Sequence, residues 1–335
     1  MFMRVVNYLL AVLAACICLT GCRAAEGSAA TGEPALALVS QREIKDILFS
    51  PDSRVLFSAS GNFFFGNIQS WDVPEGMERP LLRDSTGMVA GLALNPAGDL
   101  LASASEDGKI RLWDAASHTL LAEWKGHDAP ARSVAFSPDG ALLASGGRDA
   151  AVRLWDVTTH EARAVLRGHQ VDVSGLAFSP DGSLLASSDG FDLRLWDVET
   201  GALLPFLPEQ HAYDAYGLVF SPDGSLLAFG SAPRTVRVWD VEAAAETRVL
   251  EAESGWLMWD VAFSPDGTLL AAGNSDGGVV VWDINTGERR ATLRGSRRGV
   301  FAVAFSPDGV FLAAGGADKM IRLWRLDDLD ELKRG

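Results

Sequence analysis

The chain has 335 residues, and its 44 Asp and Glu outnumber its 29 Lys and Arg, which gives a formal net charge of −15 at pH 7. A field of that sign repels phosphate backbones, so nucleic acid is not an expected partner, and solubility is its simplest consequence. All three cysteines lie within the first 22 residues, so no disulfide is expected in the folded domain.

The first 21 residues are predicted to be a secretory signal peptide. Arg4 precedes an apolar stretch from Val5 to Leu19, which is short for a transmembrane helix of about 20 apolar residues. The stretch runs into the sequence LTGC, which ends at Cys22 and resembles the lipobox of bacterial lipoproteins. That resemblance implies cleavage before Cys22 and lipidation of its thiol, with an uncleaved membrane anchor as the alternative.

Residues 22–33 are small and polar after the cysteine and are predicted to form a flexible tether. Several acyl chains on one cysteine would hold the protein stably in a bilayer. We therefore expect an exported protein that is lipid-anchored to the bacterial cell envelope, on its periplasmic or extracellular face.

Two marks recur in phase along the rest of the chain, with a period near 42 residues. Six of the seven tryptophans in the first mark are followed by Asp, and the second mark is the tetrapeptide Ser-Pro-Asp-Gly. Such a period indicates one supersecondary unit repeated seven times, because no single unit buries its apolar face alone. The tryptophans are Trp71, Trp113, Trp155, Trp196, Trp239, Trp282 and Trp324, and the tetrapeptides begin at Ser137, Ser179, Ser221, Ser264 and Ser306.

Each repeat is predicted to hold four short strands. Residues 133–156 contain three apolar runs separated by turn residues, and a fourth run follows at 162–169. In the tetrapeptide, proline presets the turn, aspartate bonds its own backbone and glycine supplies a left-handed residue. No sustained helical periodicity competes in this region.

The repeat closely resembles the WD40 family over roughly residues 35–325. The resemblance implies an all-β, seven-bladed β-propeller with four antiparallel strands per blade, here at residues 34–325. It also implies a hydrogen-bonded tetrad of His, Ser, Asp and Trp inside a blade, while the first and fifth repeats have Phe65 and Pro233 where the Asp belongs. The matching tetrads are His127, Ser145, Asp149 and Trp155, and His169, Ser187, Asp189 and Trp196.

The last repeat stops one strand short, at Trp324. An unassigned strand-like run, residues 34–40, precedes the first repeat. An open blade would leave an exposed edge, so we expect this N-terminal run to complete blade seven and close the ring. Residues 326–335 are predicted to be a short polar C-terminal tail.

The sequence offers no convincing catalytic or metal site, and no cofactor is expected. A G-x-S-x-G pattern centred on Ser275 lies at a strand-turn-strand corner rather than at the strand-turn-helix turn that a nucleophile requires. The histidines fall on different blades, so they are not expected to converge on a metal.

A binding surface has a clearer sequence signal. Trp256 and Trp259 lie where neighbouring repeats have a Gly-His loop, and this repeat has none. By resemblance to the family, their positions face the narrow end of the propeller, which other members use for partners; packing of both rings into the channel is the alternative. The candidate partner-binding residues are Tyr216, Trp256, Leu257, Trp259 and Phe301, with Phe64 placed to extend the arc.

These observations predict a non-catalytic protein–protein interaction scaffold, monomeric, that binds a protein or peptide at its narrow face. An envelope hydrolase or lactonase-like propeller enzyme, or a small-ligand sensor using the central channel, is the alternative.

Overall fold

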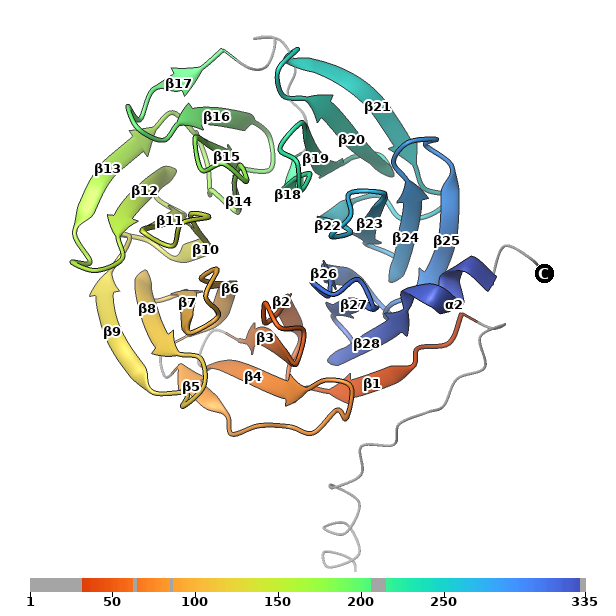
Figure 1. Cartoon of the computed structure of the whole chain (residues 1–335). Helices are drawn as coiled ribbons and strands as arrows, with labels where there is room; N and C mark the ends of the chain where they lie inside the picture. Colours follow the sequence, from red (N-terminus) through yellow and green to blue (C-terminus); the bar gives the residue numbers. More distant parts are fainter. Residues whose placement is uncertain (1–31, 63–64, 85–86, 206–214, 332–335) are drawn as a thin grey trace, which may run out of the picture.

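A computed structural model describes residues 32–62, 65–84, 87–205 and 215–331. These residues form seven four-stranded antiparallel sheets arranged as blades around a central axis (Figure 1). The predicted all-β seven-bladed propeller is confirmed. In the described residues, no helix has the length and apolar character needed to cross a membrane.

Each blade runs from an innermost strand beside the channel to an outermost strand at the rim (Figure 1). The innermost strands of blades one to seven are β2 (Ile44–Phe49), β6 (Val89–Leu94), β10 (Ala131–Phe136), β14 (Gly175–Phe178), β18 (Tyr216–Phe220), β22 (Met258–Phe263) and β26 (Val300–Phe305). The second strands are β3 (Val55–Gly61), β7 (Leu100–Ser105), β11 (Leu142–Gly147), β15 (Leu184–Ser188), β19 (Leu226–Ser231), β23 (Leu269–Asn274) and β27 (Phe311–Gly316). The third strands are β4 (Gly66–Asp72), β8 (Lys109–Asp114), β12 (Ala151–Asp156), β16 (Leu193–Asp197), β20 (Thr235–Asp240), β24 (Gly278–Asp283) and β28 (Met320–Arg325). The outermost strands are β5 (Leu82–Asp84), β9 (Leu120–Lys125), β13 (Ala162–Arg167), β17 (Leu203–Leu204), β21 (Ala245–Glu251), β25 (Arg289–Arg294) and, for blade seven, β1 (Leu36–Val39).

The N-terminal strand closes the ring, as the sequence predicts. β1 pairs antiparallel with β28, with Leu36 opposite Leu323 and Val39 opposite Met320 (Figure 1). Leu36 and Leu38 point into a buried apolar cluster shared by blades seven and one. The third strand of blade seven is therefore covered on its outer edge, which removes a template for pairing with other chains.

The two ends of the ring differ in their connections. The turn end carries the Ser-Pro-Asp-Gly turns and the turns after each third strand. The opposite end, which we call the narrow end, carries the loops between second and third strands and the crossovers between blades. β1 begins at the turn end, beside the last residues of β28, and runs to the narrow end. There the N–H of Ser40 donates to the Lys319 carbonyl.

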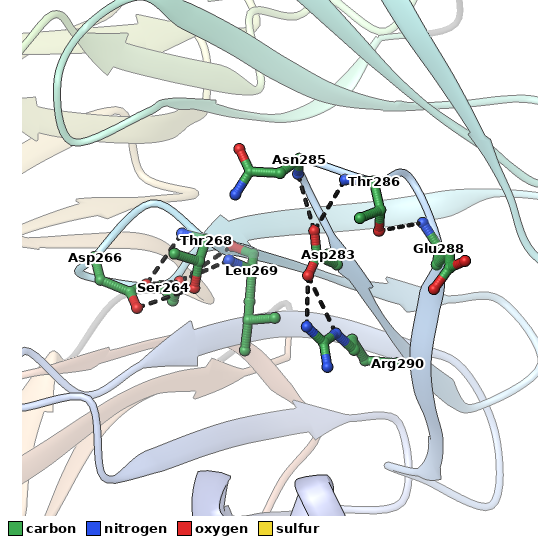
Figure 2. Close-up of polar contacts among 9 residues, drawn as sticks. All are labelled: Ser264, Asp266, Thr268, Leu269, Asp283, Asn285, Thr286, Glu288 and Arg290. Carbon is green, nitrogen blue, oxygen red and sulfur yellow. Dashed lines mark hydrogen bonds and ion pairs between the residues drawn. The ribbon is translucent and has the colours of Figure 1, made fainter. Parts of the chain in front are cut away.

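Side-chain hydrogen bonds fix the turn end, as blade six illustrates (Figure 2). Ser264 Oγ donates to Asp266 Oδ1 at 2.6 Å and accepts the N–H of Leu269 at 2.9 Å. Asp283, after the blade tryptophan, accepts the N–H of Thr286 at 2.9 Å and lies 2.6 Å from the Arg290 guanidinium (Figure 2). These bonds, led by the one from Arg290, lower the pKa of Asp283 to about 2, so its carboxylate stays charged and keeps its donors.

The C-terminal segment differs from the expected polar tail. Its first residues form a short helix, α2 (Leu326–Glu331), which begins directly after β28. Leu329 is buried and packs with Trp324 and Leu293 on the outside of blades six and seven. The four acidic residues of this segment make it appear polar in the sequence. In the helix, however, Leu326 and Leu329 lie three positions apart on one face, where they bury apolar surface.

Candidate partner-binding surface

The predicted tetrads come together inside blades three and four. In blade three, Ser145 Oγ lies 2.8 Å from His127 Nε2 and accepts the Trp155 indole N–H at 2.8 Å, while His127 Nδ1 lies 2.8 Å from Asp149. Burial lowers the pKa of His127 more than Asp149 raises it, so the ring is neutral at pH 7. Because both ring nitrogens are hydrogen-bonded within the blade, we assign His127 a role in stabilising the fold.

Blade four repeats this arrangement with one residue fewer. His169 Nε2 and the Trp196 indole N–H each lie 2.7 Å from Ser187 Oγ, and His169 Nδ1 lies 3.1 Å from Asp189. Burial alone would raise the pKa of Asp189, but hydrogen bonds from His169 and two backbone N–H groups lower it to about 2.

The two irregular repeats use different interiors. In blade five, Phe229 is fully buried at the place that Ser145 holds in blade three. In blade one, Ser40 Oγ donates to the buried Gln69 amide oxygen at 2.5 Å, and Gln69 donates to Glu78 at 2.9 Å. Phe65 is 58% exposed at the narrow end. Blade five thus relies on packing, whereas blade one has a polar network of Ser40, Gln69 and Glu78 in place of the tetrad.

Three of the predicted binding residues form a continuous aromatic row at the narrow end, which we call the aromatic arc: Tyr216, Trp259 and Phe301. The Tyr216 and Trp259 rings meet edge to face with centroids 5.2 Å apart, and Trp259 meets Phe301 in the same way at 6.1 Å. All three side chains are partly exposed. They come from the innermost strands of blades five, six and seven, so the arc lies along the channel mouth.

β-Bulges explain why the Trp259 and Phe301 side chains reach the narrow end, whereas in blade five the skipped residue is Gly217, next to Tyr216. The pairing of innermost and second strands skips one residue near the start of six blades, and that residue is Trp259 in blade six and Phe301 in blade seven. A bulge re-aims its extra residue away from the regular alternation of the sheet. The skipped residue is Lys45 in blade one and Arg132 in blade three. The channel mouth is therefore lined by aromatic side chains at some blades and by cations at others.

Trp256 and Leu257 lie beside the arc on a fixed loop. Trp256 is 68% exposed, yet its backbone N–H donates to Ser275 Oγ at 2.8 Å and its carbonyl accepts the N–H of Arg234 at 3.0 Å. The Leu257 carbonyl accepts the N–H of Ser275. Ser275 therefore acts as a loop anchor in the structure. The Trp256 ring is not packed into the channel, whereas Trp259 is packed between two neighbouring rings while staying partly exposed.

Two predicted site residues lie outside the described residues. These are Phe64, placed to extend the arc, and Cys22, the predicted lipidation site.

The narrow end of blades two to four is ionic rather than aromatic. Arg132 lies 2.6 Å from Glu106 and 3.5 Å from Asp172, and Arg148 lies 3.4 Å from the same Asp172. These two arginines and two carboxylates pair with one another. The mouth is thus divided into an aromatic half and a self-paired ionic half.

Two carboxyl groups on innermost strands were missed by sequence reasoning. Asp46 Oδ2 accepts the N–H of Leu92 at 2.8 Å, and Asp260 Oδ2 accepts the N–H of Val303 at 2.9 Å, so each links its blade to the next. Burial raises the pKa of Asp46 to about 6, and burial together with the Asp46 charge raises that of Asp260 to about 7. Among the described residues, no group of three or more His, Cys, Asp or Glu could hold a metal ion.

Comparison with known families agrees with this architecture. Residues 88–259, just over half of the chain, match the family model described as IFT122 first beta-propeller. Residues 245–283 and 287–325 match the model described as WD domain, G-beta repeat. No curated protein matches the chain. Both models describe the fold seen here, and the chain belongs to the WD40-repeat β-propeller family.

Proposed function

We propose that the protein is a non-catalytic interaction module that binds a protein or peptide partner through the aromatic arc. The observation that carries the proposal is the row formed by Tyr216, Trp259 and Phe301, with the exposed Trp256 beside it. Aromatic side chains at the centre of an interface supply much of its binding energy. WD40 propellers generally act as scaffolds for protein partners, which supports the same proposal.

The proposal extends to where the module works. The LTGC sequence at Cys22 supports export and lipid anchoring at the bacterial envelope, with residues 22–33 as a tether. A lipid-anchored propeller would present its narrow end to partners in the periplasm or outside the cell. We propose no enzymatic role, because the tetrad side chains and Ser275 serve hydrogen-bonding roles within the fold.

The test is quantitative capture of partners from detergent-solubilised envelopes with the full chain and with Trp259→Ala. A buried aromatic anchor contributes about 2 to 4 kcal/mol, so the variant should bind roughly thirtyfold more weakly or worse. Trp259 also packs on two rings, so circular dichroism must show that the variant is folded, and Trp256→Ala provides a second variant with little packing to lose.

Leu121→Ala is the matched control, because Leu121 is 55% exposed on β9, the outermost strand of blade two, away from the arc. The control should bind like the parent. If folded Trp259→Ala and Trp256→Ala proteins both retain every partner at parental affinity, the arc is not the binding site.

A further inference from the structure

A hollow of about 410 Å³ opens at the narrow end beside the aromatic arc, where blades seven, one and two meet. Lys45 joins the hollow to the arc, because it lines the hollow and its Nζ lies 4.7 Å from the centre of the Phe301 ring. A peptide with one side chain packed on the arc would therefore place its next residue at the hollow. The lining residues are Gln41, Arg42, Glu43, Lys45, Gly61, Asn62, Met88, Glu106 and Lys319.

The hollow has more positive charge than its own carboxylates neutralise. Glu43 is paired with Lys45 at 2.9 Å, and Glu106 is paired with Arg132 at 2.6 Å. Arg42 and Lys319 have no carboxylate within salt-bridge distance in the part of the chain that the structure describes; Arg42 instead lies 5.9 Å from the centre of the Phe65 ring. Two cations are thus left to face a ligand.

The same excess continues along the rim of blades five to seven. Arg234, Arg297 and Arg298 are exposed at the narrow end, and none of them pairs with a carboxylate of the described residues. Of the nearby carboxylates, Glu253 pairs with Arg289 at 2.6 Å and Asp318 pairs with Arg322 at 2.8 Å. Asp276, which accepts the N–H of Gly255, and Glu251, at the end of β21, pair with no cation of the described residues. Among the described residues, five unpaired cations (Arg42, Lys319 and these three arginines) stand against four unpaired carboxylates (Asp276, Glu251, Asp46 and Asp260), and burial raises the pKa of the last two, which favours their neutral forms. The aromatic half of the mouth therefore keeps an excess of positive charge, although the whole chain carries −15.

We propose, building on the function proposed above, that the partner is an acidic polypeptide segment. One apolar side chain of this segment packs on the arc, and an adjacent Asp or Glu enters the hollow between Arg42 and Lys319. Carboxylates bound by arginine and lysine form charge-assisted hydrogen bonds, which are stronger than neutral ones. The surrounding cations attract the acidic segment from a distance and raise its association rate.

The position of the N-terminus favours this partner over an anionic bilayer. Gly32 lies at the turn end, where its carbonyl accepts the Trp324 indole N–H at 3.0 Å, and β1 carries the chain from there toward the narrow end. A tether of residues 23–33 would have a typical span of roughly 18 Å. A lipid at Cys22 would thus hold the turn end toward the membrane, with the basic mouth facing away from it.

The first test is selection of peptides from a display library of random dodecapeptides on the full chain, with Trp259→Ala and Trp256→Ala proteins panned in parallel. Peptides enriched by the parent should combine an aromatic or leucine residue with adjacent Asp or Glu, and both variants should lose that enrichment. Enrichment of basic or uncharged peptides that still depends on Trp259 or Trp256 would overturn the acidic partner while leaving the proposed binding site intact. Enrichment unchanged in both variants, or no enrichment, would overturn both.

The second test measures affinity of one enriched peptide by fluorescence polarisation at low and high salt. The double variant Arg42→Glu, Lys319→Glu should bind at least tenfold more weakly at low salt and lose most of the salt dependence. The control Arg163→Glu, Arg167→Glu makes the same charge change on the exposed face of β13 and should stay within about twofold of the parent. Equal weakening by both variants would show that only net charge matters and would overturn the site.

The same assay distinguishes the other anionic ligands. Labelled oligo-dT and vesicles containing phosphatidylglycerol should bind at least tenfold more weakly than the peptide. Tighter binding of either probe, lost in the Arg42→Glu, Lys319→Glu protein, would replace the acidic peptide with that ligand class.

Discussion

Closure of the ring by β1 can be tested with two substitutions on one strand. Leu38 is fully buried among Leu36, Ile321 and Leu323, whereas its neighbour Val39 is 67% exposed. Truncating a buried leucine to alanine removes apolar burial and leaves a cavity, so Leu38→Ala should lower the free energy of unfolding by about 3 kcal/mol. Val39→Ala, which keeps the same backbone ladder, should change it by less than about 0.5 kcal/mol.

Removal of the whole strand should be far more damaging. Deletion of residues 34–40 takes away Leu36 and Leu38, which together contribute about 3 to 6 kcal/mol by burial, and uncovers the edge of β28. That loss is a large part of the 5 to 15 kcal/mol that holds a typical domain together. We expect the deleted protein to aggregate or to unfold well below the parent.

Urea unfolding followed by tryptophan fluorescence measures these effects, because the seven blade tryptophans are all buried. Equal slopes for parent, Leu38→Ala and Val39→Ala would allow their midpoints to be compared directly. If Leu38→Ala and Val39→Ala unfold at the same urea concentration, β1 does not close the ring as described.

Three further predictions concern single side chains. Ser145→Ala should lower the free energy of unfolding by about 2 kcal/mol in the same urea assay, because His127 and Trp155 both lose a buried partner; an unchanged midpoint would contradict this role. Burial raises the pKa of Asp260 from 3.8 to about 7, so the folded state holds this proton more tightly and the free energy of unfolding falls as pH rises from about 4 to above 7. In Asp260→Asn, the free energy of unfolding should depend less on pH, so the difference in urea midpoint between variant and parent should change with pH. A difference that stays constant across this pH range would contradict the role of Asp260. Cys22→Ser should leave the precursor unlipidated and uncleaved, and mass spectrometry showing an unmodified Cys22 still joined to Gly21 in the parent would disprove the anchor.

The fold could be predicted from sequence because its determinants are local and repeated. Each Ser-Pro-Asp-Gly turn carries its own hydrogen bonds, as those of Ser264 and Asp266 show, and seven repeats in phase leave one arrangement that covers every apolar face. Ring closure followed from counting strands. The segment after Trp324 was harder, since six acidic and apolar residues are too few to establish a helical period.

The candidate site was predictable only where family position and residue type coincided. Trp259 and Phe301 were found in this way, but the bulges that aim them outward leave no mark in the sequence, since Ala90 occupies the same slot in blade two. Asp46 and Asp260 were missed for a related reason. Their position holds Gly91 and Ser133 in other blades, so a carboxyl there resembles an ordinary polar residue of an alternating strand until the next blade buries it.

The net charge of the chain does not predict the charge of the partner that we propose. The total of −15 predicts repulsion of anions averaged over the whole surface, but salt screens charges more than about 10 Å apart. A ligand at the arc therefore senses mainly the groups within that distance. There Lys45 and Arg322 neutralise the carboxylates of Glu43 and Asp318, and burial raises the pKa of Asp46 and Asp260, which favours their neutral forms. Pairing in the folded chain, which the sequence does not reveal, decides which charges remain to meet a partner, so an acidic protein can hold a basic binding site.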